Sequence, residues 1–79
     1  LNLKTENMIR FRYYGKLDAK SVSYVKIYNV KGRFITRKGM GIKGFSSWYP
    51  PPDIASGIYI AQMISDNKIV DAVTFTILK

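Results

Sequence analysis

The chain of 79 residues contains no His and no Cys, so it lacks the commonest general base, the thiolate nucleophile and the usual zinc ligands. Acid–base chemistry would have to use its five acidic side chains and its lysines. Asp66 and Asp71 flank an expected turn, where a pair of aspartates is ordinarily solvated and shapes the turn. We therefore expect no enzymatic activity, no cofactor and no metal site.

A glycine-rich segment at residues 39–44 contains Lys43, a combination that can hold phosphate. The segment lacks the Gly-Lys-Ser/Thr ending of a phosphate-binding loop, and the sequence after it has no helical periodicity. We interpret it as a loop between two strands.

Positive charge is concentrated in the first half of the chain. Residues 1–43 carry eleven basic and two acidic side chains, a net charge of +9, whereas residues 44–79 carry two basic and three acidic ones, a net charge of −1. This asymmetry is typical of proteins with an anionic partner, such as nucleic acid, lipid headgroups or acidic glycans. The alternative is a solvated surface that keeps a β-domain soluble, because the charges are spread singly and lysines on strand edges block aggregation.

Several aromatic residues could stack on a sugar ring if they are exposed. Trp48 is expected to pack in the core, whereas Tyr49, next to it, would point the other way in an extended chain and so be exposed. Together with the basic residues near the N-terminus, these aromatics suggest one ligand or partner face, composed of Arg10, Arg12, Tyr13, Tyr14, Trp48 and Tyr49.

The elements that must position these residues have the period of two that is typical of strands. The strands are expected at residues 8–14, 22–29, 33–37, 45–48, 58–64 and 69–78. Lys31-Gly32 and Asp66-Asn67 supply hairpin turns, and three prolines at residues 50–52 predict an extended crossing. No stretch has apolar residues at helical spacing. Six or so short strands favour a small sandwich or barrel.

A chain of 79 residues allows one domain with a small core. Alternation within the strands places the core at Phe11, Val25, Ile27, Trp48, Tyr59, Val73 and Phe75. No apolar run approaches the roughly 20 residues of a membrane span, and no signal peptide is recognisable. The start at Leu1 rather than Met suggests a piece of a longer protein.

Five sequence runs, taken in order, resemble a known family. They are residues 8–11 (MIRF), 25–35 (VKIYNVKGRFI), Trp48, 55–60 (ASGIYI) and 75–79 (FTILK). The pattern is similar to that of the immunoglobulin-like C-terminal sorting domain of the type IX secretion system, which is related to the immunoglobulin-like part of the flagellar hook-capping protein. It covers residues 8–79, and its motif residues map onto Gly32, Trp48, Ser56, Gly57, Tyr59 and Lys79. The three prolines and the basic first half depart from the family.

The resemblance implies a small immunoglobulin-like antiparallel β-sandwich of about seven short strands, formed by residues 1–79 as a single domain. It also implies a longer exported protein, with a cargo domain in front of Leu1 and an outer-membrane secretion machinery as partner. The location would be secreted or on the bacterial cell surface, reached through the periplasm. The motif residues would serve mainly the fold, and the machinery would read the folded surface and the C-terminal strand.

Three alternatives remain open from the residues themselves. One is an accessory carbohydrate-binding module of a secreted glycoside hydrolase or adhesin, with an anionic glycan or polysaccharide as ligand. Another is a basic β-barrel that binds nucleic acid by stacking and phosphate neutralisation, although nucleic acid ranks last among the partners. Its basic and aromatic face would consist of Arg10, Arg12, Tyr13, Tyr14, Lys26 and Tyr28. A structural spacer is the third.

Overall fold

The computed structural model describes residues 8–18 and 20–78, and every regular element in this part of the chain is a β-strand. The strands are β1 (Ile9–Arg12), β2 (Ser23–Asn29), β3 (Phe34–Gly39), β4 (Phe45–Trp48), β5 (Gly57–Ser65) and β6 (Lys68–Ile77). Each lies within two residues of an expected strand. The described residues form six strands, one fewer than the resemblance implies, and contain no helix long and apolar enough to cross a bilayer.

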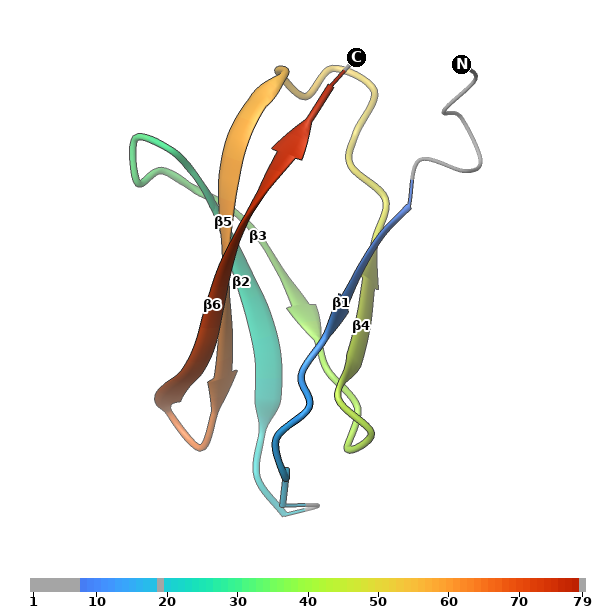
Figure 1. Cartoon of the computed structure of the whole chain (residues 1–79), viewed down its shortest axis with the longest axis vertical. Helices are drawn as coiled ribbons and strands as arrows, with labels where there is room; N and C mark the ends of the chain where they lie inside the picture. The colour runs from blue at the N-terminus through green and yellow to red at the C-terminus, as the bar shows by residue number, and fades with distance from the viewer. Residues whose placement is uncertain (1–7, 19, 79) are drawn as a thin grey trace.

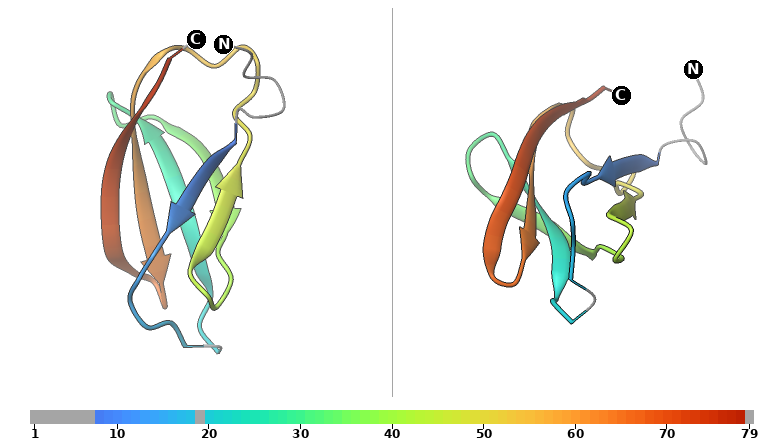
Figure 2. Two further views of the ribbon diagram at one scale, coloured as in Figure 1. Left: turned by 45° about the vertical axis from the view of Figure 1, so that its right-hand side comes forward. Right: turned by 60° about the horizontal axis from the view of Figure 1, so that its bottom comes forward.

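The strands form two antiparallel sheets that pack as a small sandwich, which confirms the expected all-β class. β1 pairs with β4 in a two-stranded sheet, and the other sheet has the order β3-β2-β5-β6. Figure 1 and Figure 2 show the small sheet lying against one side of the large sheet. The small sheet therefore covers only part of its larger neighbour.

Two hairpins follow from the local chemistry of their turns. Asp66 and Asn67 both have positive φ, 53° and 62°, as a two-residue turn of type I′ requires, and Asp and Asn tolerate this region better than most residues. In the β2–β3 turn Gly32 has φ 83°, and its N–H donates to the Asn29 carbonyl at 2.9 Å. The Asn29 side chain accepts hydrogen bonds from the next backbone N–H groups, which fixes the turn.

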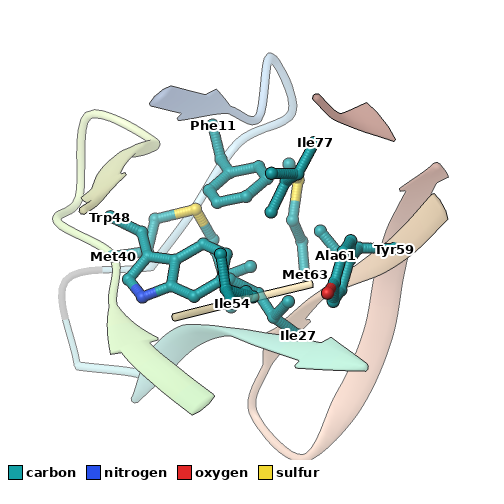
Figure 3. Packing of buried hydrophobic residues seen from close by; sticks show 10 residues of the cluster. Phe11, Ile27, Met40, Trp48, Ile54, Tyr59, Ala61, Met63 and Ile77 are labelled. Atoms are coloured by element: carbon teal, nitrogen blue, oxygen red, sulfur yellow. The ribbon is translucent and has the colours of Figure 1, made fainter. Parts of the chain in front are cut away.

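The core lies between the two sheets (Figure 3). Five of the seven expected core residues are buried, namely Phe11, Val25, Ile27, Trp48 and Tyr59. Ala61, Met63 and Ile77 are also buried, in strands that the sequence located correctly.

The last strand corrects the expected core. Phe75 is only half-buried, although its ring meets Phe11 edge-on at 5.4 Å and stacks on Tyr59 at 5.9 Å. Val73 is 39% exposed, so its assignment to the core was wrong. The physical reason is that β6 is the outermost strand of the large sheet, and the opposing sheet has too few strands to cover it completely.

Two loop residues complete the core that the strands leave open. Met40 follows β3 and is 7% exposed, with its N–H donating to the Ser23 carbonyl at 3.0 Å. Ile54 follows the prolines and is 9% exposed. Figure 3 shows both side chains gathered with the Trp48 indole. The segments expected to be simple connections therefore each contribute an apolar side chain to the core.

Candidate functional site

The expected ligand face divides between the two sides of the small sheet. In the β1–β4 pair Arg10 lies opposite Ser47 and Arg12 opposite Phe45, and both arginines are exposed. Ile9 lies opposite Trp48 on the inner side, where the indole is only 5% exposed. Since side chains alternate along a strand, Trp48 is a core residue and cannot belong to the same surface as the arginines.

The tyrosines divide in the same way. Tyr14 is 84% exposed and Tyr49 is 61% exposed. Tyr13 is half-buried and packs against the core, and its N–H donates to the Gly44 carbonyl at 2.8 Å. Gly44 has φ 81°, and a Cβ there would collide with the Tyr13 carbonyl oxygen, so only glycine fits this approach. Tyr13 therefore serves the fold rather than the exposed face.

We call the outer surface of the small sheet the arginine–aromatic face; it comprises Arg10, Arg12, Tyr14, Phe45 and Tyr49. The Arg12 guanidinium carbon lies 4.3 Å from the centroid of the Phe45 ring and 4.8 Å from that of the Tyr14 ring. Contacts of this kind hold the planar guanidinium in place by cation–π attraction. Within the described residues no carboxylate forms an ion pair with Arg12.

This arrangement can bind an anion chemically. A guanidinium fixed over aromatic rings still has N–H donors at its rim, and these match a carboxylate, sulfate or phosphate in two-point fashion. Phe45 was missed from the sequence as part of this face, where residues 45–48 were treated only as a short apolar strand. The signal was available, because placing Trp48 inward makes Phe45, three residues earlier, point outward.

A second surface joins two of the runs that resemble the sorting-domain family. Asn29, Val30 and Lys31 at the β2–β3 turn and residues 55–59 at the start of β5 line an open cleft of about 350 Å³. We call it the hairpin cleft. Asn29 pairs with Tyr59 in the sheet, and the Tyr59 hydroxyl donates to the Ala55 carbonyl at 2.6 Å. This hydrogen bond gives the hydroxyl of the buried Tyr59 a partner at the end of the sheet that borders the cleft.

The motif residues do not all lie at this cleft. Ser56, Gly57 and Tyr59 line it, and Gly32 follows directly after its Lys31. Gly57 also pairs with Ile77, so the end of β6 lies beside the same segment. Trp48 is in the core instead, and Lys79 lies outside the described residues.

The structure also places the other residues that the sequence suggested for catalysis, phosphate binding or nucleic-acid binding. Asp66 forms the β5–β6 turn, and Asp71 accepts a hydrogen bond from the Ala72 N–H at 2.8 Å. Residues 39–44 end β3 and lead into β4. Lys26 and Tyr28 lie on the outer side of the large sheet, opposite in the sandwich to Arg10 and Arg12. The face suggested for nucleic acid is therefore not one continuous surface.

Comparison of the chain with protein-family models, curated proteins and solved structures found no match. The function must therefore be inferred from the chain's own residues and their arrangement.

Proposed function

We propose that this domain is the non-catalytic sorting domain of a longer exported protein, recognised as a folded unit by a type IX outer-membrane secretion machinery. The supporting observation is the hairpin cleft. Two of the runs that resemble that family, residues 25–35 and 55–60, are far apart in the sequence and yet both contribute residues to the same cleft. A functional surface shared by the two segments would explain why both contribute to the resemblance.

The chemistry of the cleft suits a short peptide segment of a receptor. Val30 is 64% exposed and Ile58 is 50% exposed, so each offers apolar surface that a partner could cover. Lys31 adds a cationic group beside them. In this proposal the cargo precedes the domain in the same chain, and the exported protein reaches the cell surface through the periplasm.

The test fuses residues 1–79 to an unrelated periplasmic passenger in a bacterium that has the type IX machinery. Val30→Asp places a charge in the cleft, and we expect the passenger to remain in the periplasm. Val22→Asp is the matched control, because Val22 is an equally exposed valine, 70%, at the other end of β2. Exposed substitutions of this kind change stability by no more than about 0.5 kcal/mol. Equal export with and without the whole domain would refute the proposal.

A second candidate function is the binding of an acidic glycan, and the geometry of Arg12 favours it. The guanidinium held between Tyr14 and Phe45 is a preorganised donor for the carboxylate or sulfate of such a glycan. At the other end of the small sheet, Tyr49 offers an exposed ring for a sugar. An accessory carbohydrate-binding module would need both kinds of contact.

Titration calorimetry with polygalacturonate, and with neutral dextran as the comparison, tests this candidate. Arg12→Gln should weaken polygalacturonate binding about tenfold or more, since a hydrogen bond to a charged group contributes about 1.5–3 kcal/mol. Lys68→Gln removes the same charge from β6 and should bind as the parent does. Equal weakening by the two substitutions would mean that only net charge matters. Equal affinity for dextran would exclude the acidic specificity.

A further inference from the structure

The two edges of the large sheet differ in how they are protected. β3 lies at one edge, and its pairing with β2 contains a bulge at which Ile35 has no partner on β2. It also carries the exposed Arg37 and Lys38. Bulges and lysines or arginines are common devices that prevent an edge strand from pairing with another chain. β1, in the small sheet, is only four residues long and carries Arg10 and Arg12. These edges are therefore poor templates for a further strand.

β6, at the other edge, lacks these devices along most of its length. It is ten residues long, and its only register irregularity lies near the hairpin, opposite Met63 and Ile64. From Ala72 to Ile77 the strand has no charge, no proline and no bulge. A long, regular and neutral edge of this kind is a template for strand addition.

The hydrogen-bond pattern shows which backbone groups of β6 point away from β5 and have no neighbouring strand among the described residues. The Ala72 N–H donates to the Asp71 side chain, which places it on the side away from β5. Alternate residues of an antiparallel strand direct both backbone groups to the same side, and the register does not shift between Ala72 and Ile77. The N–H and C=O groups of Thr74 and Thr76 therefore also face the free edge.

The hydrogen bonds at the opposite edge of the sheet give the same direction for the backbone groups of β6. The Asn29 N–H donates to the Arg33 carbonyl, so Asn29 faces the β3 side. Its neighbour Tyr28 then faces β5, where its partner is Ile60, and Ile60 in turn lies opposite Thr74. Because Ile60 directs its groups toward β2, Thr74 directs its own away from β5. The hydrogen bond of the Ala72 N–H and that of the Asn29 N–H therefore lead to the same result: the backbone groups of Thr74 point away from β5.

We propose that the free edge of β6 pairs antiparallel with the β6 edge of a second copy of this chain, so that two four-stranded sheets become one sheet of eight strands. Such an interface is isologous, with the same strand contributed by both copies. Centred on Thr74, the pairing sets Ala72 opposite Thr76 and Val73 opposite Phe75, so no like charges meet. It also covers Val73 and Phe75, which the fold leaves partly exposed.

The distribution of charge is what favours a second copy through this edge. The chain has a net charge of +8, so most orientations of two copies repel each other. The β5–β6 hairpin is the exception, because residues 66–71 contain Asp66, Lys68 and Asp71. Arg37 and Lys38 lie at the opposite edge of the sheet. Pairing through β6 keeps the basic surfaces of the two copies apart, and added salt should strengthen it.

Hydrogen exchange measured residue by residue tests the pairing on the unaltered chain. At about 1 mM protein, where a dimer with a millimolar dissociation constant is still half formed, the amides of Thr74 and Thr76 should exchange about half as fast as in dilute solution. The amides of Val73 and Phe75 already bond to β5 and should change less. Concentration-dependent protection of β3 instead, or of no strand, would overturn the proposal.

Two substitutions at one position provide the second test. Thr74→Pro removes a free-edge N–H without removing a bond to β5, and it should yield a folded monomer. Thr74→Val keeps the N–H and the β-branched shape, and it should retain the dimer. At about 1 mM protein, sedimentation equilibrium should then give 9.0 kDa for the proline variant and a weight-average mass about one and a half times this for the valine variant, because about half of its chains are paired. A parent that remains at 9.0 kDa at this concentration, or a proline variant that dimerises as the parent does, would refute the pairing.

Discussion

β5 and β6 are neighbours in one sheet, and their inner faces differ sharply in burial. Tyr59, Ala61 and Met63 of β5 are 5%, 0% and 1% exposed. The residues directly opposite them on β6 are Phe75, Val73 and Asp71, which are half-buried, 39% exposed and exposed. Residues that pair with each other on the same face of the sheet are therefore buried on β5 and at least partly exposed on β6.

The cause is the size of the covering layer. Two strands face four, and Figure 2 shows β6 at the margin of the large sheet. Phe11 reaches Phe75, the β6 residue that remains half-buried, but the cover does not extend to Val73. Residues with the same alternation thus contribute unequally to stability, and four substitutions measure how unequally.

Met63→Ala should have the largest effect. Met63 is 1% exposed on the inner face of β5, and truncating such a side chain removes transfer free energy and leaves a cavity. The expected loss is about 2–5 kcal/mol, measured by urea unfolding. For a small domain this is a large fraction of the total stability. A loss below 1 kcal/mol, on the order of a surface change, would show that β5 is not the centre of the core.

Phe75→Ala should follow, with a loss of about 1–3 kcal/mol, because only part of the ring is removed from water and the full cost of a buried phenylalanine does not apply. The contacts at risk are those with Phe11 and Tyr59. Unfolding of Phe75→Leu, which keeps apolar volume, serves as the control. A loss equal to that of Met63→Ala would mean that β6 is covered as completely as β5.

Tyr59→Phe should have a smaller effect of about 0.5–1.5 kcal/mol, the usual net contribution of one hydrogen bond. The substitution removes only the hydroxyl, which donates to the Ala55 carbonyl, and leaves the buried ring in place. Thermal unfolding followed by near-ultraviolet circular dichroism measures it. An unchanged melting temperature would indicate that water replaces the lost donor.

Val73→Ala should have the smallest effect, within about 0.5 kcal/mol of the parent in dilute solution, as is usual for exposed positions. Urea unfolding compared with Val25→Ala, a fully buried valine on β2, makes the contrast direct. If both variants lost the same free energy, the exposure of β6 in the monomer would be contradicted.

The local sequence pattern was sufficient to predict the strands and two of the turns. Alternation located all six strands, and Gly32 and the Asp66-Asn67 pair marked two turns, because positive φ is tolerated by few residues. The sequence also identified Phe11 and Trp48 as buried. These properties depend on a residue and its immediate neighbours, which is why they can be predicted without knowing the rest of the fold.

Only the tertiary structure decided which of these faces is covered. Val73 alternates as a core residue does, but its burial depends on β1 and β4, which are distant in sequence and too few to reach it. In the same way, β1 and β4 pair although β2 and β3 separate them in the sequence. This pairing brings the Arg12 guanidinium against the Phe45 ring. Contacts between remote segments determine burial and binding surfaces, and no local pattern in the sequence contains them.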